Sequence, residues 1–291
     1  MIIDFKQIIY SYNTFIKDSK LLAKQYKNIL KYITIGNSHD NRDIVLLKLG
    51  KGKIKIIITA GVHGRESINT IVIMKIIEDL ASIYKKDKDN ILNKFTFYII
   101  PMLNPDGYMI ALNGFDEINE LNLRMKCKKF NIAYPEWKYN ARGVDINRNF
   151  PSKLWNANDI NDFIASEKET KALIYAFKKY KSTVFFDIHS RGKEIYYYRS
   201  VMSNKYNMFQ LYIAMRIEKA IGYKLVKPKD EIDYNDSGGN TVHYFSEYFI
   251  MPALTIETIN NEETFPLDIS LREETYNELN NFIYCLDDIF I

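Results

Sequence analysis

Two histidines and a glutamate in this chain have the residue types and spacing needed to hold a metal ion. His63 and Glu66 lie three residues apart in GVHGRES, and His189 ends the apolar segment VFFDIH. Zn²⁺ accepts imidazole nitrogen and carboxylate oxygen, and a catalytic zinc site uses three protein ligands and leaves one position for water. These residues therefore predict one zinc ion per chain.

A hydrolytic zinc site also needs a base that takes a proton from water and passes it to the leaving group. Glu257 ends the apolar segment PALTIE and is the candidate for that base. An HxxE pair alone occurs by chance in many chains, so the argument depends on where His189 and Glu257 fall. The remaining histidines, His39 in a polar turn and His243 in a predicted helix, are interpreted as non-ligands with surface or packing roles.

Strands that alternate with helices are expected to position these residues. A helix is predicted over about residues 10–26, and two short strands, ILKYITIG and DIVLLKLG, flank a polar turn. The apolar segment from Ile54 predicts a buried strand that gives way to a helix near His63. Further strands are predicted at FTFYIIP, STVFFDIHS, EIYYYRS and PALTIET. Further helices are predicted at SEKETKALIYAFKKY, over about 206–221, near Val242 and from about Leu271.

This alternation predicts an α/β fold, a three-layer sandwich in which helices flank a mixed, mostly parallel, twisted sheet. Nothing resembling a linker or an internal repeat divides the sequence, so residues 1–291 are expected to form one catalytic domain that includes the N-terminal helix and hairpin of 1–50. Ligands of such sheets bind beyond the carboxyl ends of strands. His63, His189 and Glu257 all fall at predicted strand ends.

Composition and charge disfavour several classes of protein. The chain is 47% hydrophobic and 26% charged, which is typical of a folded globular protein. Lys and Arg exceed Asp and Glu by only 40 to 36 and are scattered, so a nucleic-acid partner is not expected. No apolar run reaches membrane-spanning length, no leader is visible, and two cysteines are too few for a disulfide framework. We therefore expect a cytoplasmic protein without a membrane partner; the oligomeric state does not follow.

Five motifs, in their order along the chain, resemble the zinc carboxypeptidase family over nearly the whole sequence. They are HxxE from His63, NPDGY over 104–108, GVDINRNFP over 143–151, FDIHS over 186–190 and TIET around Glu257. Within the family, WKYNARGVDINRNFP, HSRGKEIYYY and DSGGN look most like the bacterial γ-D-glutamyl-diamino acid peptidases of cell-wall turnover. The resemblance implies a zinc carboxypeptidase-like fold and a zinc-dependent metallopeptidase.

The resemblance also implies roles that spacing alone does not assign. Asp145 would orient the imidazole of a zinc-bound histidine, because the second ring nitrogen needs an acceptor. Asn147 and Arg148 look like the pair that binds a free carboxylate of the substrate, since a guanidinium offers a planar fork to carboxylate oxygens.

Two further roles come from the same comparison of motifs. Arg142 resembles the basic residue that polarises the scissile carbonyl and stabilises the oxyanion, with Arg124 as a competing candidate. Tyr234, ahead of SGG, resembles the family tyrosine that closes over bound substrate. The implied mechanism is hydrolysis without a covalent enzyme intermediate, in which Glu257 takes the water proton and returns it to the leaving amine.

The implied reaction cleaves the γ-D-glutamyl-diaminopimelate amide bond of a peptidoglycan stem peptide or muropeptide that carries free carboxylates. Arg191 could contribute to binding such a substrate, and Glu194, Tyr196 and Tyr198 could line the pocket for the leaving residue. The alternative enzyme is a metallocarboxypeptidase that removes C-terminal residues from ordinary peptides or proteins. A non-catalytic binding module would be marked by loss of a ligand or of the base, and neither is missing. A related amidohydrolase or deacylase is disfavoured by the intact NPDGY and GVDINRNFP segments.

Overall fold

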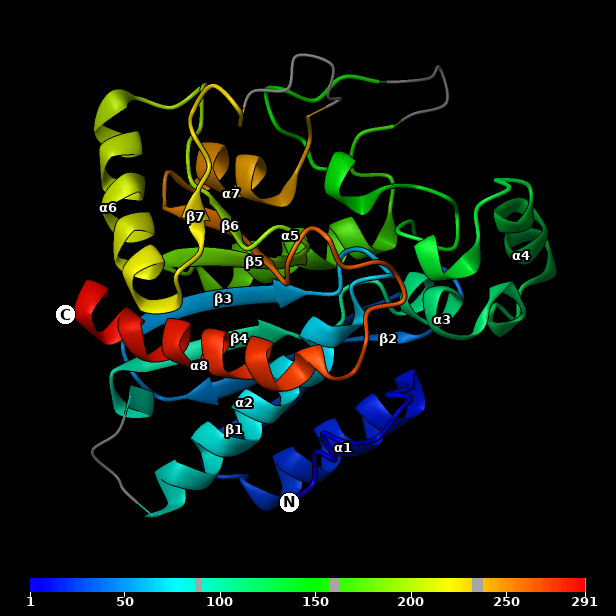
Figure 1. Cartoon of the computed structure of the whole chain (residues 1–291), viewed down its shortest axis with the longest axis horizontal. Helices are drawn as coiled ribbons and strands as arrows, with labels where there is room; N and C mark the ends of the chain where they lie inside the picture. The colour runs from blue at the N-terminus through cyan, green and yellow to red at the C-terminus, as the bar shows by residue number, and fades with distance from the viewer. Residues whose placement is uncertain (87–90, 158–162, 232–237, 291) are drawn as a thin grey trace.

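The computed structural model describes residues 1–86, 91–157, 163–231 and 238–290. These residues form an eight-stranded mixed sheet in the order β1-β2-β4-β3-β5-β8-β6-β7 (Figure 1). Its strands are β1 (Leu30–Asn37), β2 (Asp43–Gly50), β3 (Ile54–Ala60), β4 (Phe95–Ile100), β5 (Val184–Ser190), β6 (Glu194–Tyr196), β7 (Lys224–Leu225) and β8 (Ala253–Thr258). The central strands β4, β3, β5 and β8 are parallel, whereas β2 and β6 join them antiparallel from either side.

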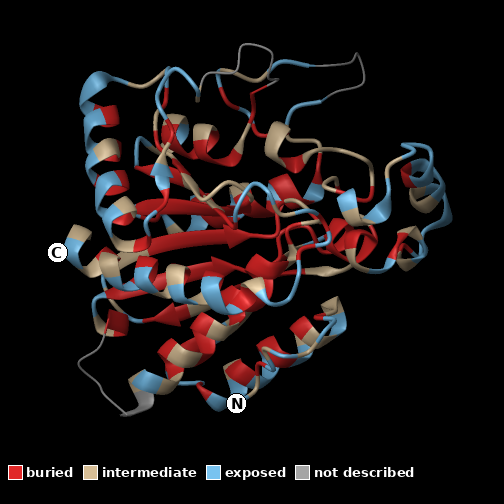
Figure 2. Ribbon diagram, in the orientation of Figure 1, coloured by how far each residue is buried: buried red, intermediate tan, exposed pale blue. Residues whose placement is uncertain are grey.

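Helices cover both faces of this sheet, so the predicted α/β sandwich with a mixed sheet is confirmed. The helices are α1 (Tyr12–Gln25), α2 (Ser67–Lys86), α3 (Pro105–Asn113), α4 (Leu121–Lys128), α5 (Lys168–Tyr180), α6 (Asn204–Ile221), α7 (Thr241–Phe249) and α8 (Leu271–Phe290). One core joins one face of the sheet to α1, α2, α6 and α8, and a second core joins the opposite face to α5 and α7. Figure 2 shows the central strands buried between these layers.

The sequence of β3 explains its central place. Ile56 and Ile58 point to the core beneath α2 and α8, while Ile57 points to the core beneath α5 and α7. Because alternate residues of a strand face opposite sides, a strand buried on both sides must be apolar throughout. Burying each such side chain contributes about 1.5–3 kcal/mol. A polar residue within such a strand therefore indicates a specific partner.

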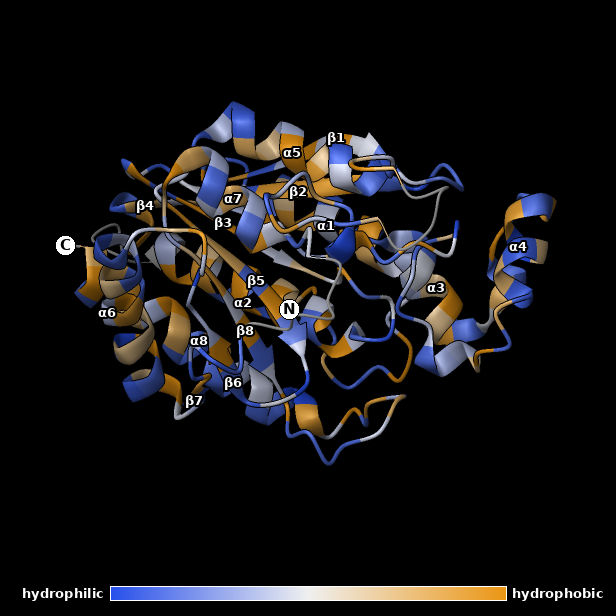
Figure 3. Ribbon diagram, turned by 90° about the horizontal axis from the view of Figure 1, so that it is seen from above, coloured by the Kyte–Doolittle hydropathy of each residue, from blue (hydrophilic) through white to orange (hydrophobic). Residues whose placement is uncertain are grey.

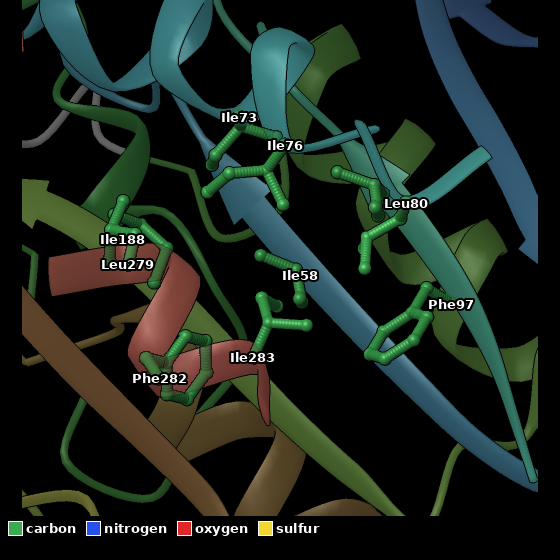
Figure 4. A pocket seen from close by; sticks show the side chains of 10 residues that line it. Ile58, Ile73, Ile76, Leu80, Phe97, Ile188, Leu279, Phe282 and Ile283 are labelled. Atoms are coloured by element: carbon green, nitrogen blue, oxygen red, sulfur yellow. The ribbon is translucent and has the colours of Figure 1, made fainter. Parts of the chain in front are cut away.

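A small cavity lies between the sheet and the helices α2 and α8 (Figure 4). Its volume is about 20 Å³, and its lining is entirely apolar: Ile58, Ile73, Ile76, Leu80, Phe97, Ile99, Ile188, Leu279, Phe282 and Ile283. A water molecule would find room but no polar partner there. The cavity is a packing feature of the core rather than a binding site.

All predicted strands and helices are present, with ends that shift by a few residues. Two helices, α3 and α4, were not predicted. α3 begins in the NPDGY motif, where Asn104 is the N-cap and Pro105 the first helical residue, both favourable positions for these residue types. α4 stands at one end of the molecule in both Figure 1 and Figure 3. Among the described helices, none combines the length and apolar character that crossing a membrane requires.

Candidate active site

The loop that joins β3 to α2 carries His63 and Glu66. The backbone N–H of Glu66 donates to the carbonyl oxygen of His63 over 3.2 Å, which closes a tight turn. A Cβ atom at Gly64 would lie 2.2 Å from the carbonyl oxygen of Gly107, so the close approach of two backbones disfavours any side chain there. The turn places both functional side chains at the carboxyl end of β3.

The NPDGY segment holds that turn in place. Asn104 accepts a hydrogen bond from the backbone N–H of Gly107 over 2.9 Å. Its side-chain amide donates to the carbonyl oxygens of Val62 and Tyr139, each over 3.1 Å. Because Val62 and Tyr139 belong to different loops, one asparagine ties the two loops to the start of α3. The motif is therefore part of the scaffold beneath the site.

Glu66 lies between the two histidines. His63 Nδ1 is 2.7 Å from Glu66 Oε1, and His189 Nδ1 is 3.1 Å from Glu66 Oε2. One candidate ligand atom from each of the three residues lies within 4.8 Å of the others. Glu66 and His189 are 2% and 1% exposed. The structure thus brings together the three residues that the sequence predicts as metal ligands.

The second ring nitrogen of each histidine faces an aspartate. His63 Nε2 lies 3.2 Å from Asp145 Oδ1, and His189 Nε2 lies 3.0 Å from Asp187 Oδ2. The Asp187 contact is an ion-pair contact rather than an aligned hydrogen bond, because His189 Nε2 has no hydrogen-bond partner in the described part of the chain. A carboxylate at this nitrogen leaves Nδ1 as the free metal ligand.

The charges of the cluster compensate one another. Burial opposes ionisation of Glu66, but the two histidines outweigh it and lower the pKa of this carboxyl to about 2. Burial likewise opposes charged imidazoles, yet Glu66 and Asp145 raise the pKa of His63, and Asp187 and Glu66 raise the pKa of His189. The surroundings therefore favour positive charge at this point, and a divalent cation would supply it once the imidazoles release their protons.

Glu257 lies next to the cluster on the neighbouring strand. The parallel register of β5 and β8 pairs it with His189, and the antiparallel register of β8 and β6 pairs it with Glu194. Burial raises the pKa of Glu257 to about 8, opposed by His189 and reinforced by Glu66. Its Oε2 atom is enclosed and has no hydrogen-bond partner among the described residues. A carboxyl with a pKa near neutrality can both accept and release a proton.

Asp145 joins the cluster to the residues predicted to bind a substrate carboxylate. Its Oδ1 accepts the backbone N–H of Asn147 over 2.9 Å at the start of a short 3₁₀ turn, η4 (Ile146–Arg148). The Arg148 guanidinium donates to the Asn147 carbonyl oxygen over 2.8 Å, and Asn147 Oδ1 accepts the backbone N–H of Thr241 over 3.1 Å. The pair lies beside the cluster, and its role in substrate binding stays a prediction.

Neither arginine proposed for the oxyanion has a described contact with the metal cluster. Arg142 donates to Glu167 Oε1 over 3.1 Å, with its side chain 39% exposed. Arg124 lies on α4 and pairs with Asp116 across 3.5 Å. Arg142 lies on the loop just before Asp145. Arg124 lies in α4, which stands at one end of the molecule (Figures 1 and 3).

Two residues near the cluster were missed in the sequence. Lys138 Nζ lies 2.7 Å from Asp145 Oδ2, and its carbonyl oxygen accepts the backbone N–H of Gly64 over 3.2 Å. One lysine among many carries no sequence signal, so only the fold could reveal it. Asp187 did carry a signal: it interrupts an apolar strand two residues before His189, and such residues face the same side of a sheet.

The other two histidines do not join the cluster. His39, predicted to have a surface or packing role, packs with its Nε2 3.0 Å from Glu167 Oε2 in a second buried group that also contains Glu169. His243 lies in α7, where burial, assisted by Arg199 and Arg148, lowers its pKa to about 3. Burial disfavours the charged form of an imidazole, and the two arginines add to that effect.

The remaining predicted substrate contacts are only partly described. Tyr234 lies outside the described residues. Arg191 hydrogen-bonds Asn261 and lies over the ring of Phe265, 5.4 Å from its centroid. Tyr196 donates to Glu194 Oε2 over 3.0 Å, next to Glu257 in the sheet.

The donor set fits zinc. Two imidazole Nδ1 atoms and one carboxylate converge, which matches the ligand types and the number of protein ligands of a catalytic zinc site. The enclosed, unpartnered oxygen of Glu257 beside this set is suited to a water molecule or substrate held at the fourth position.

Comparisons with known proteins agree with the motifs. The family model described as zinc carboxypeptidase matches residues 16–278. The chain is similar to γ-D-glutamyl-L-diamino acid endopeptidase 1 of Lysinibacillus sphaericus, with 30% identity over 50% of this chain and 38% of that protein. It is also similar to an inactive metallocarboxypeptidase, ECM14, of Ajellomyces capsulatus, with 29% identity over 69% of this chain and 36% of that protein.

Human carboxypeptidase A6 is 26% identical over 60% of this chain and 41% of its own length. The chain thus spans well under two thirds of the length of these relatives. The chain also superposes on the crystal structure of thrombin activatable fibrinolysis inhibitor with a TM-score of 0.79. The match covers 98% of this chain and 75% of the inhibitor chain at 21% identity, which shows a shared fold.

Proposed function

The chain belongs to the zinc carboxypeptidase family, and from this premise we propose that it is a zinc metallopeptidase that hydrolyses the γ-D-glutamyl-diaminopimelate amide bond of peptidoglycan stem peptides or muropeptides. The observation that carries the peptidase activity is the convergence of His63, Glu66 and His189 with Glu257 as the sheet neighbour of His189. Metal ligands and a proton-transferring carboxylate at one point are the groups that metal-assisted hydrolysis of an amide uses.

In the proposed mechanism, the residues of the chain bind, orient and transfer protons. His63, Glu66 and His189 would hold a zinc ion, which would lower the pKa of a water molecule and polarise the scissile carbonyl. Glu257 takes the proton of the attacking water on a carboxylate oxygen and then delivers it to the leaving nitrogen. Arg142 donates to the developing oxyanion, which requires its guanidinium to leave or share its contact with Glu167.

The charge around the site supports a substrate rich in carboxylates. Asn147 and Arg148 are connected to the cluster by hydrogen bonds, because Asn147 donates to Asp145 and Arg148 donates to Asn147. Two more guanidinium groups, of Arg65 and Arg191, lie 4.6 Å and 5.4 Å from the ring centroid of Phe265. Arg65 and Arg191 are each two residues from a predicted metal ligand in the sequence, and Arg65 also pairs with Glu136 across 3.2 Å. A tripeptide that ends in γ-D-glutamyl-diaminopimelate carries several carboxylates that such groups can bind.

The finer substrate assignment is supported by similarity to the endopeptidase of L. sphaericus, and the alternative is supported by similarity to carboxypeptidase A6 over a larger share of this chain. The alternative enzyme removes C-terminal residues from ordinary peptides with the same metal and base. ECM14 is named as inactive, so the similarity to it makes a non-catalytic binding function a second alternative. The present chain keeps all three predicted ligands and Glu257, which favours catalysis.

The two free cysteines, Cys127 and Cys285, suit a reducing compartment, so we place the reaction in the cytoplasm on released muropeptides. The zinc-loaded protein is to be incubated with L-Ala-γ-D-Glu-meso-diaminopimelate and, separately, with a conventional peptide, and the products identified by mass spectrometry. Release of diaminopimelate from the first alone supports the proposal. Cleavage of the conventional peptide alone assigns the chain to the carboxypeptidase alternative, and cleavage of neither peptide counts against a peptidase.

A further inference from the structure

Asp187 is a fully buried carboxylate in the middle of the molecule. It lies on β5, the central strand of the sheet between β3 and β8, and is 0% exposed. Its Oδ1 accepts a hydrogen bond from the hydroxyl of Thr59, and its Oδ2 accepts one from the hydroxyl of Thr241. The side chain is therefore fixed from two sides, by a neighbouring strand and by the first residue of α7.

A buried carboxylate needs a positive partner, because leaving water costs several kcal/mol that neutral donors only partly offset. Within the part of the chain that the structure describes, His189 is the basic side chain in contact with Asp187, with Nε2 at 3.0 Å from Oδ2. The opposite ring nitrogen of His189 faces Glu66. Asp187 and Glu66 therefore contact the same imidazole from opposite sides.

The two histidines of the cluster are arranged alike. In each, Nδ1 faces Glu66 and Nε2 faces an aspartate, which is Asp145 for His63 and Asp187 for His189. The two aspartates differ in their other contacts. Asp145 also pairs with Lys138 and is partly exposed, whereas Asp187 is sealed in the core.

Asp187 also connects to the residues proposed to bind substrate. Thr241, whose hydroxyl donates to Asp187, donates its backbone N–H to Asn147 Oδ1 over 3.1 Å. A continuous path therefore runs from the metal ligand His189 through Asp187 and Thr241 to Asn147. Movement of Asp187 would disturb both ends of that path, because each contact is a single hydrogen bond or ion pair.

We propose that Asp187 is a positioning residue that orients His189 for metal binding and, through Thr241, holds Asn147 for substrate binding. The inference rests on the proposed function, since it assumes that the cluster binds zinc and that Asn147 contacts substrate. Carboxylates in this position commonly change metal affinity or activity by about 10- to 100-fold when replaced. Asp187 is expected to fall in that range.

The test compares Asp187→Asn, Thr241→Val and Thr241→Ser in the zinc-loaded full chain. Zinc release to a chromogenic chelator is measured alongside KM and kcat for whichever peptide is cleaved. Asp187→Asn is expected to release zinc about 10- to 100-fold faster and to raise KM. Thr241→Val, which replaces the hydroxyl with a methyl group, is expected to raise KM with a smaller effect on zinc release. Thr241→Ser, which keeps the hydroxyl and removes the methyl group, is expected to have a KM close to that of the parent protein.

Zinc release at the parent rate from a folded Asp187→Asn protein would overturn the proposal. If that variant does not fold, as judged by circular dichroism, Thr241→Val decides: an unchanged KM and unchanged zinc release overturn it as well. The release assay needs no substrate, so failure to cleave either peptide would defeat the proposed function without deciding the role of Asp187. Failure of the parent protein to bind zinc would defeat both.

Discussion

In the described part of this chain, histidines and buried glutamates meet in two groups of three residues, and only one group has the contacts of a metal site. The first is His63, Glu66 and His189, and the second is His39, Glu167 and Glu169. In the first group, both imidazoles face the same carboxylate and have aspartates behind them. These contacts are with groups that a metal ion can use or that support a metal ligand.

In the second group, other donors occupy the carboxylates. Asn140 donates to Glu167 Oε2 over 2.7 Å and to Glu169 Oε2 over 3.2 Å, and Arg142 donates to Glu167 Oε1 over 3.1 Å. A cation placed there would have to displace an amide and meet a guanidinium. The difference shows that residue type and proximity do not suffice to define a metal site. A metal site also needs carboxylate and imidazole lone pairs that no other hydrogen-bond donor occupies.

The largest expected difference between the two groups is in zinc binding. His63→Ala is expected to lose zinc and nearly all turnover, because it removes one of three ligands, a larger change than the roughly 10- to 100-fold cost of losing an outer partner. His39→Ala is the matched variant and is expected to keep one zinc per chain. Elemental analysis after gel filtration measures both. Stoichiometric zinc in the His63 variant, or its loss in the His39 variant alone, would reverse the assignment of the two groups.

The next difference concerns two glutamates, Glu257 near the first group and Glu169 in the second. Burial raises the pKa of both. Glu257→Gln is expected to keep zinc and lose about 10²- to 10⁴-fold in kcat, the usual contribution of a general acid-base residue. Glu169→Gln, an equally conservative change at a buried site, is expected to show no comparable loss. Equal kinetics for the two variants would remove Glu257 from the role of base.

Arg142 contacts Glu167 of the second group and precedes Asp145 beside the first by three residues, so it sharpens the comparison. Arg142→Met is expected to lower kcat by about 10²- to 10³-fold if its guanidinium stabilises the oxyanion. Lys138→Met tests the competing cation, since Lys138 lies 2.7 Å from Asp145 and thus close to the first group. Steady-state kinetics of both variants decide. A loss confined to the lysine variant would transfer the role to Lys138 and leave the second group as scaffold alone.

Much of this site could be predicted because its residues stand where regular patterns end. His63, His189 and Glu257 follow or finish apolar strands, and a polar side chain there has few structural reasons to exist. The α/β order could be predicted for the same reason, since helix and strand periodicities alternate clearly. The antiparallel places of β2 and β6 in the sheet depend on tertiary pairing that no local pattern encodes.

Other parts of the site could not be predicted because they depend on loops brought together by the fold. Lys138 and Asn104 act through contacts with backbone atoms of distant loops. The polar neighbours of His39 in the sequence predict only a surface or packing role. Its burial against Glu167 comes from α5 packing beside β1, a contact between segments more than a hundred residues apart.

The smallest expected effect concerns stability and again separates the two groups. Burial raises the pKa of Glu169 to about 7, opposed by His39 and reinforced by Asp106, whereas a glutamate in the unfolded chain titrates near about 4.3. Between these values the native state holds a proton that the unfolded state has released, so the free energy of unfolding falls as pH rises through this window. The loss is at most about 4 kcal/mol.

Glu169→Gln removes this titration and is expected to flatten the dependence between pH 5 and pH 8, with the variant more stable than the parent protein at pH 8. Urea unfolding at both pH values, with the same zinc content, measures the difference. Glu273→Gln on the exposed side of α8 serves as the matched control and should follow the parent protein. Parallel curves for the Glu169 variant and the parent would mean that the second group holds Glu169 ionised throughout. Both groups would then hold ionised carboxylates, and the contacts of Asn140 and Arg142 would be the difference that separates the second group from the first.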